Sequence, residues 1–282
     1  MEETTAHALP QASPALWLLS LLIACAAAHL LMGYVRHARR EGRAWSRRMA
    51  PWLGMTAFGI GATAAMALAL ASQAVAYPFG YLRLGVGASA VAAVVGAAAM
   101  ALLSVSWLNA ATVITAAAAL GVGCTASGML LVRSIGLLPG LEWSYPQLGA
   151  GAALASMVVG AGLWLGLLGP GLGSRHRRAW RAAAAAVVGV GVVMAQQFVL
   201  AAGDMSTQIS SSYRDDIGSM ALTVAAAAGV PMLLGVLLFD LHMREMRAKL
   251  EAVGARRPRG QRTTRRRAAT AAPRAGRRSA SR

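Results

Sequence analysis

Four sulfur-containing side chains occupy related places in three apolar stretches of the sequence. Each stretch carries a Gly-x-Gly pair, and Met66, Met129 and Met194 follow the first glycine of their pair by seven, eight and five residues. Cys124 precedes Met129 by five residues. Thioether and thiolate sulfur are ligands that Cu(I) prefers, so one interpretation is a soft-metal site that binds copper. We favour the other, in which methionine fills irregular gaps between helices, because the three offsets do not share one helix face. No cofactor is then expected.

A few other polar residues lie inside apolar stretches. His29 is in the first stretch, and Gln196 and Gln197 are in the sixth. A histidine at membrane depth is a candidate ligand or proton carrier, but no acidic residue lies at that depth to complete a relay. We favour a neutral imidazole that is hydrogen-bonded to a neighbouring helix. The two glutamines either line a polar outer pocket or form hydrogen bonds between helices, and we favour the hydrogen bonds.

The sequence contains no recognisable catalytic arrangement. The His-Glu-x-x-His, P-loop and Gly-x-Ser-x-Gly motifs are all absent. Asp204, Asp215 and Asp216 share one loop, but they have neither a nearby histidine nor a fixed ligand spacing, so we expect a solvated loop. We therefore predict that the chain is not an enzyme.

The composition predicts that these residues are positioned by membrane-spanning helices. Apolar residues make up 57% of the 282-residue chain and charged residues only 13%, against about 25% charged residues in soluble domains. Mean hydropathy is +0.54 although there are 27 basic and 10 acidic side chains, so the charges must be separated from long apolar runs. This pattern excludes an ordinary soluble domain and indicates an all-α integral membrane protein in contact with the lipid bilayer.

Seven stretches reach the roughly 20 apolar residues that a spanning helix needs. They are continuous and rich in Ala, Leu and Met, without the alternation of barrel strands. Residues 1–14 carry Glu2 and Glu3 and no basic residue, so the first stretch is expected to be a retained anchor rather than a signal peptide. The seven predicted transmembrane helices are 15–35, 52–76, 84–105, 110–132, 147–168, 182–202 and 218–239.

Arginine placement predicts the orientation of these helices. The loop at 36–50 holds six Arg, the loop at 169–181 holds four, and the segment after residue 239 holds fourteen Lys and Arg. The other side holds only Arg83, Arg133 and Arg214. The positive-inside rule then places the N-terminus outside and the C-terminus in the cytoplasm.

Three of the predicted helices carry the Gly-x-Gly pair at a similar place: Gly59 with Gly61, Gly121 with Gly123, and Gly189 with Gly191. In the second and third cases, Tyr145 and Tyr213 each stand 24 residues beyond the first glycine. The Tyr77-Pro78 pair of the first case recurs as Tyr145-Pro146. Each unit would consist of an outward helix, an outer loop and a returning helix, which predicts a three-fold parallel repeat of helix pairs. Taken alone, each glycine pair is explained by close helix packing.

In its seven spans, Arg-rich first inner loop, Gly-x-Gly pairs and Tyr-Pro loops, the region around residues 15–240 resembles the MHYT family of bacterial integral membrane sensor domains. That resemblance implies a signalling context and, in the family, a proposed copper site that senses a diatomic gas. The family's Met-His pair would fall near Ala65-Met66, Ser127-Gly128 and Ala195-Gln196. No histidine occurs in these three helices, so the histidine ligands are missing and the resemblance is to a degenerate domain.

The segment after residue 239 divides in two. Residues 240–253 predict a short juxtamembrane helix, and 254–282 are rich in Arg, Ala, Pro, Gly, Ser and Thr without apolar periodicity, which is typical of disorder. A basic segment beside a membrane attracts anionic lipid head groups. We favour lipid over nucleic acid as its partner, because no aromatic residue interrupts the run to stack on bases.

The expected organisation is therefore an extracytoplasmic segment (1–14), a seven-helix MHYT-like domain (15–239), a juxtamembrane helix (240–253) and a basic cytoplasmic tail (254–282). We predict a multi-pass protein of the cell membrane that serves as a non-enzymatic sensory or signalling component. Because the 43 residues after residue 239 leave no room for an output domain, it would act through an unknown protein partner. The alternative is transport of a small solute or ion, although the spans lack the polar or broken helices usual at transport sites.

Overall fold

The structure, a computed structural model, describes residues 13–40, 44–73, 79–106, 109–138, 141–168, 177–203, 210–211 and 216–255. Residues 1–241 form one compact unit, and residues 242–282 form a second unit, of which only the last part of one helix is described. The helices are α1 (Pro14–Arg40), α2 (Ala44–Ala71), α3 (Arg83–Ser106), α4 (Ala110–Arg133), α5 (Tyr145–Leu168), α6 (Arg177–Ala202), α7 (Ser219–Val224), the π-helix η1 (Ala225–Gly229) and α8 (Val230–Ala255). Four two-residue strands complete the described elements: β1 (Gly80–Tyr81), β2 (Leu137–Leu138), β3 (Ser210–Ser211) and β4 (Ile217–Gly218).

Among the described residues, seven helical segments are long and apolar enough to cross a membrane. This confirms the predicted all-α class and the predicted number of such helices. Two ends of the spanning segments differ from the prediction by five residues or more. The second helix ends at Ala71 rather than at residue 76, and the chain beyond it tightens, with the N–H of Gln73 donating to the carbonyl of Leu70 at 3.1 Å. The seventh apolar segment continues past residue 239 to Leu250, because α8 runs on without a break.

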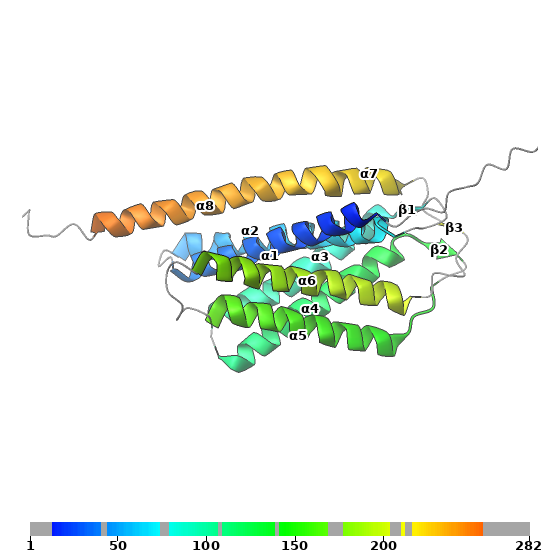
Figure 1. Ribbon diagram of the computed structural model, residues 1–282, viewed down its shortest axis with the longest axis horizontal. Coiled ribbons are helices and arrows are strands. Elements are labelled where there is room, and N and C mark those ends of the chain that lie inside the picture. The colour runs from blue at the N-terminus through cyan, green and yellow to red at the C-terminus, as the bar shows by residue number, and fades with distance from the viewer. Residues whose placement is uncertain are drawn as a thin grey trace, which may run out of the picture. The chain divides into compact units, whose positions relative to one another are not determined.

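Helices α1 to α6 pack as a closed ring in which each helix contacts the next and α6 returns to α1. The even-numbered helices α2, α4 and α6 also contact one another, so they form the inside of the bundle. Their apolar segments are accordingly more buried than those of α1, α3 and α5. The helices lie side by side, and the four short strands gather at one end (Figure 1).

The Gly-x-Gly pairs lie at the contacts that hold this ring together. The first glycine of each pair meets the odd-numbered helix that follows around the ring: Gly59 meets α3, Gly121 meets α5 and Gly189 meets α1. The second glycine meets the preceding odd-numbered helix: Gly61 meets α1, Gly123 meets α3 and Gly191 meets α5. A β-carbon at Gly123 would lie only 2.8 Å from the Cα of Gly96, so two helix backbones touch there. These glycines therefore serve helix packing.

The last helical segment, up to Leu241, lies outside the ring and contains a π-helix. It contacts α2 through α7 and η1, and Leu241 of α8 packs against Gly33 of α1. Pro231 has no backbone N–H and its ring would collide with a carbonyl one turn earlier, and the π-helix η1 occupies the turn before it. The helix is thus irregular just before this proline, where it forms a π-turn.

Candidate functional site

The four sulfur-containing candidates lie on the inner helices but differ in burial. Met66 of α2 and Cys124 of α4 are each only 1% exposed, whereas Met129 of α4 and Met194 of α6 are half-buried. The difference follows from their unequal offsets, which turn the methionines to different sides of their helices. No group of three or more His, Cys, Asp or Glu in the described part of the chain is arranged to hold a metal ion. This does not test a copper site built on methionine, and the favoured interpretation, in which the methionines fill gaps between helices, stays a prediction.

The two glutamines of α6 behave differently from each other. Gln197 accepts a hydrogen bond from Nε2 of Gln73, beyond the end of α2, at 3.3 Å, so a hydrogen bond to a distant part of the chain is present for this glutamine. Gln196 is completely buried, and neither of its side-chain polar atoms has a hydrogen-bond partner among the described residues. His29 is half-buried in α1. The first apolar segment extends to Ala38, so it also includes the buried His37.

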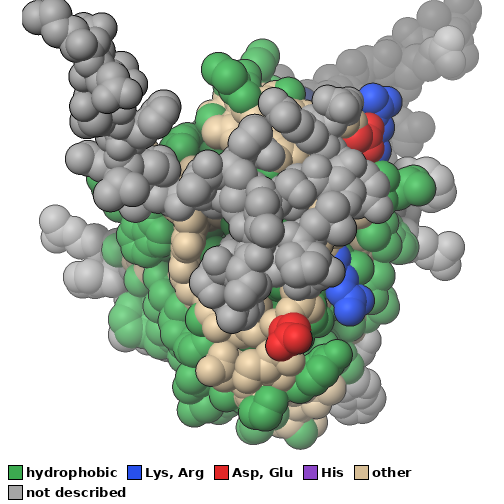
Figure 2. Space-filling view, turned by 90° about the vertical axis from the view of Figure 1, so that its right-hand side faces the viewer, with side chains coloured by type: hydrophobic (Ala, Val, Ile, Leu, Met, Phe, Trp, Pro, Cys, Tyr) green, Lys and Arg blue, Asp and Glu red, His purple; other side chains and the backbone are tan. Residues whose placement is uncertain are grey.

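Three connections far apart in sequence are joined at the end of the bundle where the strands lie; we call this the strand end. Strand β1, between α2 and α3, pairs antiparallel with β4, before α7, and β2, between α4 and α5, pairs antiparallel with β3. The backbone N–H of Leu82 also donates to the carbonyl of Ser134 at 2.8 Å. All three connections are thereby tied into one surface. Figure 2 looks onto this end, where a few acidic and basic side chains lie within a largely hydrophobic rim.

An ion pair fixes the start of α3 at the strand end. Nε of Arg83 lies 2.7 Å from Oδ1 of Asp216, and the backbone N–H of Arg83 donates to Oδ2 at 3.0 Å. The carboxylate therefore satisfies a free N–H at a helix N-terminus, where negative charge is favoured. The expectation that the three aspartates are simply solvated is wrong for Asp216. Asp204 and Asp215 lie outside the described residues.

Strand β1 carries a buried aromatic side chain, that of Tyr81. Tyr81 is 1% exposed, and its ring meets that of Phe79 edge to face with centroids 5.6 Å apart. Tyr81 stands between the second and third spanning segments. Burial raises the pKa of the Tyr81 phenol well above its ordinary value, because the phenolate would lose its hydration.

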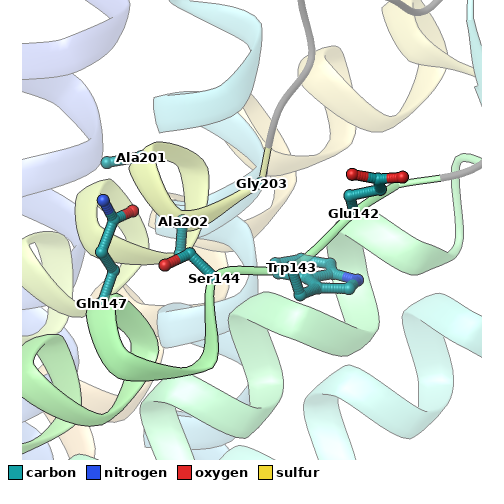
Figure 3. Close-up of a pocket in the computed structure, with 7 residues that line it drawn as sticks. All are labelled: Glu142, Trp143, Ser144, Gln147, Ala201, Ala202 and Gly203. Atoms are coloured by element: carbon teal, nitrogen blue, oxygen red, sulfur yellow. The ribbon is translucent and has the colours of Figure 1, made fainter.

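A shallow pocket of about 470 Å³ opens at the strand end between the start of α5 and the end of α6. It is lined by Glu142, Trp143, Ser144, Gln147, Ala201, Ala202 and Gly203. Figure 3 shows Glu142 and Trp143 on one side of it and Gln147 on the other. The backbone holds the two sides together, since Trp143 bridges to Gly203 and the N–H of Ser144 donates to the carbonyl of Ala202 at 2.9 Å.

The pocket combines a carboxylate, an indole ring, a hydroxyl and a carboxamide. A carboxylate and an aromatic face both attract cations, so this lining suits a small polar or cationic molecule better than an anion. The sequence alone does not indicate this pocket. The available signal was an acidic residue next to an aromatic residue in a predicted outer loop, but their proximity to the end of α6 depends on tertiary structure.

Comparison of the chain with models of known protein families, with curated protein sequences and with solved structures found no match.

Proposed function

We propose that this chain is a non-enzymatic sensory or signalling component of the cell membrane, resembling a degenerate MHYT sensor domain and acting through a protein partner. The observation that carries the proposal is the strand end. There, the three connections form one hydrogen-bonded surface, directly continuous with helices whose backbones touch through glycine. A ligand held in the pocket between α5 and α6 would therefore act on a tightly coupled helix ring.

The packing of the helices supports signalling over the alternative of transport. Transporters commonly place discontinuous helices and polar groups near the bilayer midplane. In the described part of the chain, α1 to α6 are each continuous, and the π-turn occurs in the segment outside the ring. The glycine contacts also leave little space between neighbouring helices of the ring.

We infer a three-fold repeat whose helix pairs are shifted by one helix from those that the sequence indicates, with support from the cyclic pattern of glycine contacts. Each inner helix uses its first glycine toward the next outer helix and its second toward the preceding one. In this arrangement α1, not α7, lies against Gly189. The repeat in three dimensions would then pair each odd-numbered helix with the even-numbered helix after it.

The test separates signalling from transport. A deletion strain should show an altered regulated response, restored by the wild-type gene, while proteoliposomes containing the purified protein should show no solute or ion flux above empty liposomes. Carrier-mediated flux of a defined solute, saturable and dependent on the protein, would contradict the proposal.

The inferred orientation places the strand end outside the cell and the basic segment 254–282 at the cytoplasmic face, in contact with anionic lipid. Replacing both native cysteines and introducing one cysteine at Gln147 or at Ser281 gives the test. A membrane-impermeant maleimide added to intact cells should label the Gln147→Cys variant and not the Ser281→Cys variant. The reverse pattern would show that the orientation is inverted.

A further inference from the structure

Gln196 is an anomaly of the bundle interior. Its side chain is 0% exposed, and neither Oε1 nor Nε2 has a hydrogen-bond partner within the described ranges. The adjacent Gln197 shows what is usual, because its carboxamide is bonded to Gln73. Buried carboxamides are almost always hydrogen-bonded, and in the interior of a membrane protein no bulk water is available to compensate.

Gln196 packs against a residue of α4 that has no side chain. The residue lies six positions before the end of α6, about 9 Å along the helix from Ala202. It faces Gly128 of α4, where an added β-carbon would lie 2.5 Å from Oε1 of Gln196 and 3.3 Å from Cγ2 of Val199. The absence of a side chain at Gly128 therefore makes a notch that receives the carboxamide.

A carboxamide has two N–H donors and two acceptor lone pairs. With Oε1 directed at the notch, Nε2 points about 120° away from it, so one protein group cannot satisfy both atoms. At Gly128 no side chain of α4 covers the helix backbone, so its polar groups are open to a small molecule beside the carboxamide. A molecule that both donates and accepts hydrogen bonds, and is small enough for a helix interface, meets these requirements.

We propose that Gln196, whose Oε1 fills the notch at Gly128, binds ordered water between α4 and α6 through its remaining donor and acceptor positions. Internal water is the usual means by which buried polar groups without protein partners are satisfied, and each such molecule makes about three hydrogen bonds. The site would hydrate the core of the ring beneath the strand end. Cys124, one helical turn before Gly128 on the same face of α4, and Val199 would be its neighbours.

The test is radiolytic hydroxyl-radical labelling of the purified full-length protein, with oxidised residues located by mass spectrometry. Bound water generates radicals in place, so the buried Cys124 and Val199 should be oxidised. Met100 of α3 is equally buried but lies 17 residues from the start of its helix, far from the site, and should stay unmodified despite its reactive sulfur.

Two substitutions complete the design. Gln196→Met keeps the length of the side chain but removes its polar atoms and should reduce oxidation of Val199 at least five-fold, whereas the matched Gln197→Met should leave it unchanged. Lack of oxidation at Val199 in the wild-type protein, or equal oxidation in Gln196→Met, would overturn the proposal. Stoichiometric metal that is lost in Gln196→Met would also overturn it, by assigning the site to an ion.

Discussion

Gly123 shows at the scale of one residue how the ring is held together. Its neighbour across the α3–α4 contact is the Cα of Gly96, so the atom that a side chain would meet is backbone and has no alternative rotamer. Gly87 also lies in α3, but a β-carbon added at Gly87 would have no neighbouring atom within 4 Å. The two glycines therefore have opposite roles, although both lie in apolar helices.

We predict that Gly123→Val destabilises the protein by about 1–3 kcal/mol, the usual cost of overpacking a close contact. Gly87→Ala is the matched control and should be neutral or slightly stabilising, because alanine leaves the unfolded chain fewer backbone conformations than glycine does. Thermal unfolding in detergent would show a midpoint several degrees lower for Gly123→Val alone. Equal midpoints for all three proteins would argue against the close contact.

The buried Tyr81 predicts an effect at high pH. Because the pKa of its phenol is raised in the folded protein above the ordinary value of 10.0, its contribution to stability is complete below about pH 10 and is lost as the pH rises further. The folded wild-type protein and Tyr81→Phe should therefore gain the same tyrosinate absorbance between about pH 9 and pH 11. If the wild-type protein gains one tyrosinate more than the variant, Tyr81 is accessible.

Two adjacent glutamines show which contacts could be predicted from the sequence and which could not. That Gln197 forms a hydrogen bond could be predicted, because an amide in an apolar span usually finds a partner. That Gln196, its direct neighbour, faces Gly128 could not, because adjacent residues lie about 100° apart on a helix and the sequence does not show which helix each will meet.

At the scale of elements, the start of α3 depends on a residue more than a hundred positions away. Asp216 accepts from the first N–H of α3 and pairs with Arg83, whose side chain is 74% exposed. The exposed ion pair alone contributes little, so most of the effect is expected from the capping of the helix N-terminus.

Asp216→Ala should therefore cost about 1 kcal/mol and increase hydrogen exchange in the first turn of α3. Asp216→Asn is the matched comparison, since its amide oxygen still accepts the N–H of Arg83 while the ion pair is lost. This variant should lose less than half as much free energy of unfolding as Asp216→Ala. If Asp216→Asn lowers the stability as much as Asp216→Ala, the charge of the carboxylate matters more than its hydrogen bond to the helix N-terminus.

The lengths of the helices could be predicted well, because the thickness of a bilayer and the runs of Ala, Leu and Val define them. A proline at position 231 favours an irregular helix but does not show that the irregularity is a π-turn. The short strands at Gly80 and Ile217 could not be predicted, since two-residue pairings form only once the helix ends have been brought together.

At the scale of the whole molecule, the order of helices around the ring was the least predictable feature. Ala and Gly occur on all sides of the spans, so periodicity does not show which face meets which neighbour. The repeat in the sequence led us to expect α6 with α7 as its third pair. In the structure α1 lies against α6, because Gly189 admits the backbone of Cys25.

The closed ring is the central claim, since the coupling of the strand end to the helices depends on it. The most direct measurement is a cross-link between Cys25 of α1 and a cysteine replacing the exposed Ala186 of α6, whose carbonyl oxygen lies 3.8 Å from Sγ of Cys25. Cys124 is replaced and a protease site is inserted between α5 and α6. With a short bifunctional maleimide, the two fragments should stay joined after cleavage and should separate when Cys25 is changed to Ala. Separation of the fragments in the two-cysteine protein, with both thiols shown to be reactive after denaturation, would contradict the ring.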